Sequence, residues 1–78
     1  MLAPALEHLV RGIVDHPDEV QVVEKYSPRG DVLEVHVHAD DLGRVIGRAG
    51  RTAKALRTLI TALADGKRVR VDVVDGDL

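Results

Sequence analysis

The chain contains no cysteine, tryptophan or phenylalanine, and only one tyrosine among its 78 residues. Without cysteine, disulfides and thiolate chemistry are excluded, and a zinc site would need histidine and carboxylates alone. A single tyrosine, with no tryptophan or phenylalanine, does not make an aromatic platform on which bases could stack. No apolar run approaches the ~20 residues that cross a bilayer, and the start lacks the basic lead of a secretory signal. We therefore expect a cytoplasmic protein with no membrane segment and no cofactor.

Charge is distributed unevenly along the chain. The net charge of −2 by itself argues against a nucleic-acid partner. However, residues 1–43 carry −6 and residues 44–78 carry +4, and residues 43–63 contain five cations and no acid. Salt screens charges over about 8–10 Å, so a local field matters more to a polyanion than the total does. The basic segment is consistent with either a polyanion site or a solvated helix face.

Hydrophobic periodicity predicts one two-layer α+β domain over residues 1–78, with a core over residues 2–75 and a frayed tail at residues 75–78. The expected order is a helix over residues 2–13, strands over residues 20–26 and 32–38, a short helix, a longer helix from residue 51 to residue 64, and a strand over residues 68–74. The two early strands form a hairpin, and three helices cover one face of a three-stranded sheet. Pro17 ends the first helix, Asp40 and Asp41 cap the short one, and Gly66 ends the long one.

The most informative segment joins the two later helices and reads Gly47-Arg48-Ala49-Gly50. Two glycines allow a sharp turn and the close approach of another backbone. The free N–H groups at the start of the following helix form an anion site, and the guanidinium groups of Arg48 and Arg51 suit phosphate. The apolar Val45 and Ile46 beside the turn could receive bases.

The run of residues 41–57, DLGRVIGRAGRTAKALR, resembles the core of a KH domain. The order α-β-β-α-α-β resembles the type II arrangement. The whole chain is similar to the small stand-alone bacterial KH-domain proteins of the KhpA (YlqC) family. This resemblance implies a single-stranded RNA partner clamped by the loop between the glycines. It also implies an RNA chaperone or post-transcriptional regulator linked to cell elongation, division and shape. A homodimer, or a heterodimer with a larger multi-domain KH protein, is implied as well.

Carried onto this sequence, the resemblance gives ten RNA-binding residues: Gly43, Arg44, Val45, Ile46, Gly47, Arg48, Ala49, Gly50, Arg51 and Lys54. Gly43 to Ile46 would form one wall of a groove, and the strand over residues 32–38 the opposite wall. Ala49 departs from the family pattern, in which a polar or basic residue is common, and this removes one phosphate donor.

Other functions are less well supported by the residues. His36 and His38 share a strand face with Glu34, but with no further ligand nearby we expect solvated side chains and no metal. No nucleophile–base pair or phosphate-binding NTPase motif is present, so we expect no enzyme. Two alternatives remain. One is a winged helix-turn-helix that binds DNA through residues 51–64. The other is a protein-interaction module that docks a partner on Leu59, Ile60 and Leu63.

Overall fold

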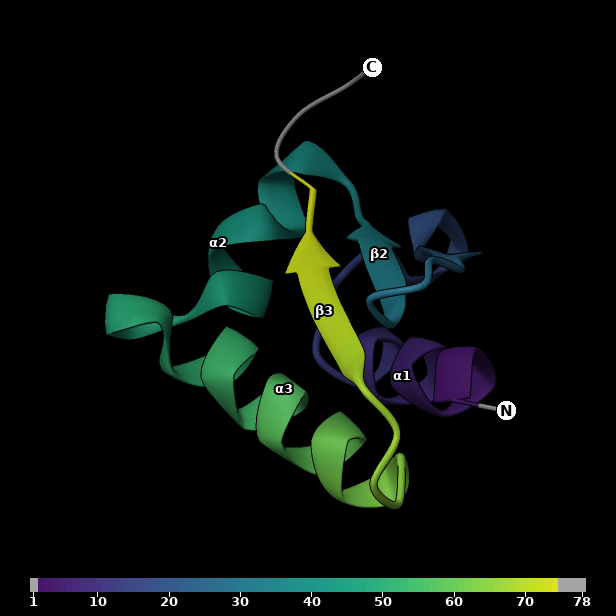
Figure 1. The fold of residues 1–78 in the computed structure, drawn as a ribbon. Helices are drawn as coiled ribbons and strands as arrows, with labels where there is room; N and C mark the ends of the chain where they lie inside the picture. The colour runs from purple at the N-terminus through teal and green to yellow at the C-terminus, as the bar shows by residue number, and fades with distance from the viewer. Residues whose placement is uncertain (1, 75–78) are drawn as a thin grey trace.

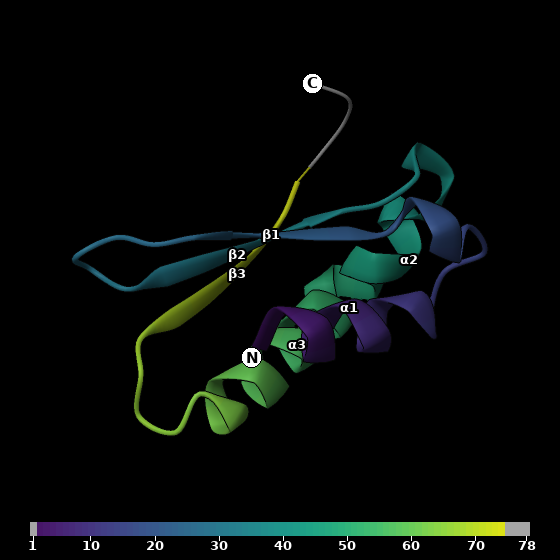
Figure 2. The same ribbon diagram turned by 90° about the vertical axis from the view of Figure 1, so that its right-hand side faces the viewer.

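The computed structural model describes residues 2–74 as a three-stranded sheet with helices packed against one of its faces (Figures 1 and 2). The main elements are α1 (Leu2–Arg11), β1 (Gln21–Lys25), β2 (Asp31–His36), α2 (Leu42–Ile46), α3 (Arg51–Leu63) and β3 (Val69–Val73). Short 3-10 turns η1 (Pro17–Glu19), η2 (Ala39–Asp41) and η3 (Arg48–Gly50) connect them. This order confirms the predicted two-layer α+β fold. The predicted frayed tail, residues 75–78, lies outside the described residues.

The central strand of the sheet is β2. It pairs antiparallel with β1, with Val22 opposite Val35, and parallel with β3, with Leu33 opposite Val71. The predicted hairpin is thereby confirmed. Parallel neighbours need a long crossover connection, and α2 and α3 supply it. In Figure 1 the loop between these two helices lies at the left edge of the molecule, away from β3.

The core lies between the sheet and the helices. Alternation along β2 turns Leu33 and Val35 towards the helices, where both are buried. Leu6 and Val10 of α1 and Ile60 of α3 meet them from the other layer, and all three are fully buried. Burying an aliphatic side chain of this size contributes about 1.5–3 kcal/mol relative to exposure. Alternation in the strands and a 3.6-residue period in the helices are what this packing requires.

The end of the first helix and the apolar face of the long helix differ from the sequence prediction. The first helix ends at Arg11, before Gly12, and not at Pro17. Ile13 and Val14 still pack against the core, so they extend the apolar pattern without extending the helix. In α3, Leu59 and Leu63 are 49% and 57% exposed, so the predicted apolar face is only partly buried. None of the helices within residues 2–74 has the length and apolar character needed to cross a membrane.

Candidate nucleic-acid interface

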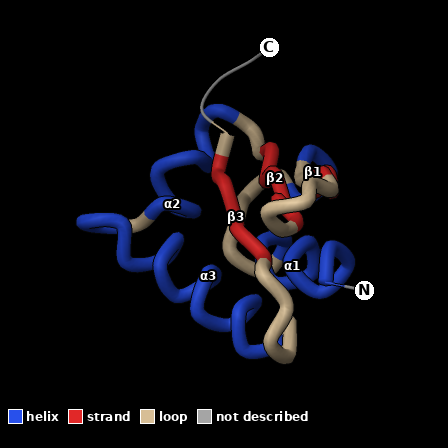
Figure 3. Tube along the Cα trace, viewed as in Figure 1, coloured by secondary structure: helices blue, strands red, loops and turns tan. Residues whose placement is uncertain are grey.

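The loop of residues 47–50 connects α2 to α3 (Figure 3). Three of its residues have positive φ: 79° at Gly47, 55° at Ala49 and 75° at Gly50. The amide of Gly47 donates to the carbonyl of Gly43 at 2.8 Å, which closes α2, and the amide of Gly50 donates to the carbonyl of Gly47 at 3.1 Å. The loop is therefore a compact, hydrogen-bonded corner.

The two glycines of the loop have different structural roles. A Cβ on Gly47 would lie 2.8 Å from both the Cβ and the backbone nitrogen of Thr52, so the corner closes only because this side chain is absent. A Cβ on Gly50 would meet nothing within 4 Å. Gly47 is thus required by packing, whereas Gly50 leaves open space above the start of α3.

Positive charge gathers around this open space. The side chains of Arg48, Arg51 and Lys54 are exposed, and within residues 2–74 none of them forms an ion pair. Gly50 precedes α3 with no side chain that could cap its free N–H groups. An α-helix carries about half a positive charge at its N-terminus. The corner therefore offers backbone donors and free cationic side chains to an anion.

The four residues predicted to form one wall of the RNA groove, Gly43 to Ile46, differ in their exposure to solvent. Gly43 is exposed on α2, and a Cβ there would meet nothing within 4 Å. Ile46 is 37% exposed, so it remains available to a ligand. Val45 is fully buried, because α2 turns it into the core. The apolar wall predicted from two residues is therefore reduced to Ile46 at the surface.

Arg44, the last of the four, is already paired. Its Nη1 donates to the Oδ1 atom of Asp15 at 2.9 Å, on the segment that follows α1. Sequence reasoning gave no sign of this contact, because the two residues are far apart along the chain. The opposite wall was assigned to residues 32–38. These belong mainly to β2, whose two edges are hydrogen-bonded to β1 and β3, so a ligand could reach only its face or its end.

Asp41 does not cap α2, and that prediction was wrong. Its side chain makes no capping hydrogen bond and is 2% exposed. Its Oδ1 instead accepts the backbone N–H of Asp15 at 3.1 Å, and its Oδ2 accepts the backbone N–H and the Nδ1 of His16, both at 3.0 Å. We call Asp15, His16, Asp41 and Arg44 the α1–α2 junction. A carboxylate is buried here because every bond it accepts comes from a fixed donor.

The junction shifts the ionisation of its two members in opposite directions. Burial alone would raise the pKa of Asp41, but the hydrogen bonds from Asp15 and His16 outweigh it and hold that pKa below its usual value. The hydrogen bond to Asp41 raises the pKa of His16. Both shifts favour the ion pair between the imidazolium and the carboxylate.

The sequence analysis placed His38 on a strand face with His36. In the structure His38 lies beyond the end of β2, and its ring stacks on the ring of His16. The two ring centroids are 4.0 Å apart, and the planes differ by 13°. With Asp40, these two histidines bring one ligand atom each to within 4.8 Å of one another. A histidine binds a metal through a lone pair in the plane of its ring, and two nearly parallel planes do not direct their lone pairs to a common point. This stacked arrangement therefore does not fit a metal ion.

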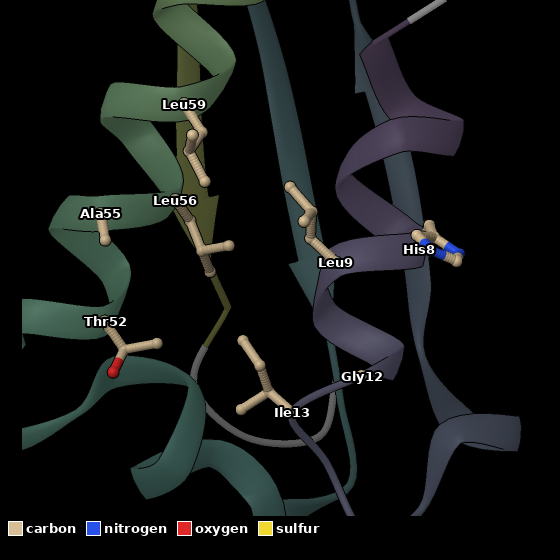
Figure 4. A pocket seen from close by; sticks show the side chains of 8 residues that line it. All are labelled: His8, Leu9, Gly12, Ile13, Thr52, Ala55, Leu56 and Leu59. Carbon is tan, nitrogen blue, oxygen red and sulfur yellow. The ribbon is translucent and has the colours of Figure 1, made fainter.

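A second surface feature is an apolar hollow of about 380 Å³ between α1 and α3 (Figure 4). Leu9 and Ile13 line it from the side of α1, and Leu56 and Leu59 from α3. It continues over the exposed flank of α3, where Arg51 and Lys54 lie beside Leu59. Of the three residues predicted to dock a partner, Leu59 lines this groove and Leu63 is exposed, but Ile60 is fully buried in the core and the prediction was wrong for it.

These features define a small α+β domain with a basic glycine loop. The family described as "KhpA/KhpB, KH domain" matches residues 4–74. The chain is 80% identical over 75 residues to "RNA-binding protein KhpA" of Leifsonia xyli, covering 96% of this chain and 99% of the relative. It is 65% identical over 77 residues to the protein of the same name from Streptomyces coelicolor, covering 99% of this chain and 96% of the relative.

The protein of the same name from Mycobacterium tuberculosis is 61% identical over 77 residues, covering 99% of this chain and 95% of the relative. No solved structure gives a significant match. The chain belongs to the KhpA/KhpB family of KH domains, and its element order is consistent with the type II arrangement.

Proposed function

We propose that this protein binds single-stranded RNA, with the phosphate backbone lying over the 47–50 loop. The observation that carries the proposal is the open space above Gly50, next to the start of α3 and three cations without an ion pair in the described part of the chain. Relatives with up to 80% identity are named RNA-binding proteins, which supports RNA as the ligand.

Each part of the site has a role in this proposal. Arg48 and Arg51 bind phosphate oxygens through their planar, fork-shaped donors, and Lys54 adds a third positive charge one turn further along α3. Gly43 and Gly50 let the backbone of the ligand approach closely. Ile46 supplies an apolar contact for a base. Ala49 contributes no phosphate donor, so binding by one domain is weak.

The salt dependence measures how many phosphates are bound. Three phosphate contacts on a single strand predict that the logarithm of the affinity falls with the logarithm of the salt concentration at a slope of about −2. A DNA-binding winged helix predicts stronger binding to duplex DNA than to single-stranded RNA. Competition between these two ligands in fluorescence anisotropy therefore separates the two functions.

The decisive variant carries Arg48→Asp together with Ala49→Asp. Asp is compatible with the positive φ of residue 49, so the fold should survive, while two carboxylates would face the phosphates. We expect the RNA affinity to fall by roughly tenfold or more. The matched control carries Pro28→Asp and Arg29→Asp, which make the same change in charge in the turn that precedes β2. A folded loop variant with undiminished RNA binding would show that the loop assignment is wrong.

The groove between α1 and α3 supports a second activity, self-association. Leu59 lines this apolar hollow and is 49% exposed, and Leu63, one turn further along α3, is 57% exposed. A homodimer, or a heterodimer with a larger multi-domain KH protein, would bury these residues and place two loops on one RNA, which raises avidity. Leu59→Glu should therefore give a monomer in analytical ultracentrifugation. A wild-type chain that is monomeric at high micromolar concentration would contradict the homodimer.

The proposed cellular role is that of an RNA chaperone or post-transcriptional regulator, linked to elongation and division. A deletion strain complemented with the Arg48→Asp/Ala49→Asp variant tests this role. We expect the deletion strain to have cells of altered length or shape. The wild-type chain should restore the normal cell length and shape, and the variant should not. Restoration by both chains would separate the cellular role from RNA binding at the loop.

A further inference from the structure

Arg44 differs from the other three cations of the site in having an acidic partner. Its Nη1 lies 2.9 Å from the Oδ1 of Asp15. Arg48, Arg51 and Lys54 have no such partner among residues 2–74. A carboxylate and a phosphate use the same guanidinium donors. An RNA phosphate that binds Arg44 must therefore share these donors with Asp15 or displace it.

Ion pairs on a protein surface are usually loose and contribute little, because two long side chains must be held in one geometry. The backbone of Asp15 is not free to move in this way. Its N–H donates to Asp41 at 3.1 Å, and the next N–H, that of His16, donates to the other oxygen of the same carboxylate at 3.0 Å.

Asp41 is itself fixed relative to Arg44. It is 2% exposed and directly precedes α2, the helix that carries Arg44. The buried carboxylate thus holds the backbone of Asp15 at a set distance from this helix. The side chain of Asp15 is short. Because its backbone is held in place, its carboxylate stays within reach of the guanidinium group of Arg44.

We propose that Asp15 is a built-in competitor of RNA for Arg44, and that it lowers the affinity of the site for phosphate. This proposal rests on RNA binding at the 47–50 loop. In the free protein, Arg44 is neutralised, and basal binding depends on the loop and on the three other cations. Removing the negative charge of Asp15 makes a fourth cation available to the RNA backbone.

The variant Asp15→Asn tests the proposal, because it keeps the backbone N–H bound by Asp41 and removes only the charge. We expect the affinity for a short single-stranded RNA to rise by roughly three- to tenfold at low salt. The salt slope should become steeper by about 0.7, the value for one more phosphate contact on a single strand. Fluorescence anisotropy across a salt series measures both quantities.

A second variant and a control identify the residue that acts. Arg44→Gln should weaken binding by less than about twofold in the wild-type background, but should abolish the gain in the Asp15→Asn background. The control Asp18→Asn removes an equal charge from η1, at an exposed carboxylate with no ion pair in the described part of the chain. It should leave the salt slope unchanged.

Three outcomes would overturn the proposal. Asp15→Asn with unchanged affinity and slope, in a chain whose binding still depends on Arg48, refutes the competition alone. A weaker Asp15→Asn variant would show that Asp15 orients Arg44 for RNA instead of competing for it. RNA binding that does not depend on Arg48 and Ala49 removes the function at the loop, and the role of Asp15 with it.

Discussion

The two ends of α2 handle charge in opposite ways. At its start, in the α1–α2 junction, the buried carboxylate of Asp41 accepts three hydrogen bonds, and Arg44 in the first turn of the helix is paired with Asp15. After the helix, around the 47–50 loop, the side chains of Arg48 and Arg51 are exposed and have no ion pair within the described residues.

This difference separates a structural use of charge from a functional one. A buried charge is stable only when the protein supplies its partners, so the carboxylate of Asp41 is committed to hydrogen bonds within the protein. Exposed charges without partners contribute little to folding, yet remain available to a phosphate backbone. The comparison therefore predicts that variants of the buried Asp41 lower stability, while variants of the loop cations lower RNA binding.

The largest effect is expected for Asp41→Ala. This change leaves the backbone N–H groups of Asp15 and His16 without acceptors and detaches the segment after α1 from α2. We expect the melting temperature to fall by roughly 15 °C. Circular dichroism would measure it. The neighbouring Asp40→Ala is the control, because that side chain is 77% exposed, and it should change the melting temperature by only a few degrees.

The next effect distinguishes the two glycines of the loop. Gly47→Ala places a Cβ 2.8 Å from atoms of Thr52, in a backbone conformation with φ 79° and ψ 169°. That conformation is essentially restricted to glycine, so we expect a loss of about 2–3 kcal/mol in unfolding free energy. Gly50→Ala meets open space and should lose only about 1 kcal/mol, the left-handed strain.

Urea denaturation measures both losses, and RNA binding of the folded variants completes the comparison. Gly50→Ala should weaken RNA binding, because its Cβ would occupy the open space above α3. Equal losses of stability in the two variants would contradict the distinction between a packing glycine and an open one.

A smaller effect of opposite sign is expected for Ala49→Gly. Ala49 has φ 55° and ψ 26°, a left-handed conformation that costs an L-residue about 1–2 kcal/mol. Glycine relieves this strain but has more freedom in the unfolded chain. The variant should therefore be more stable by about 0.5 kcal/mol, measured by urea denaturation. A less stable variant would mean that the side chain of Ala49 contributes packing.

The smallest effect is a dependence of stability on pH at the junction. The pKa of His16 is raised in the folded state. Its contribution is therefore fully present below its ordinary pKa and is lost as the pH rises through the raised value. Asp41, whose pKa is lowered, contributes above its ordinary pKa and loses this contribution as the pH falls through the lowered value.

The melting temperature of the wild-type chain should consequently fall as the pH rises from about 6.5, the ordinary pKa of histidine, through the raised pKa of His16. In His16→Gln the fall should be smaller. His8 is at an exposed position on α1, so the melting temperature of His8→Gln should fall with pH as much as that of the wild-type chain. If His8→Gln and His16→Gln reduced the fall equally, the junction would not be its source.

Much of the fold could be predicted because its signals are local. Alternation along residues 32–38 marked the central strand, and the glycines of the loop marked the break between the two later helices. The errors arose where an apolar residue at helical spacing was compatible with more than one environment. Ile13 and Val14 are apolar at helical spacing but pack beyond the end of α1. Leu59 satisfies the helical period, yet the sheet does not reach it.

The sequence alone determined the order of helices and strands, the glycine loop and the position of the cations, because each of these depends on neighbouring residues. Only the tertiary structure decided which charges are available. Asp41 looked like a helix cap and is a buried acceptor, and Arg44 looked free and is paired with Asp15. Both contacts join segments more than twenty residues apart, and a contact between distant segments exists only after the chain has packed.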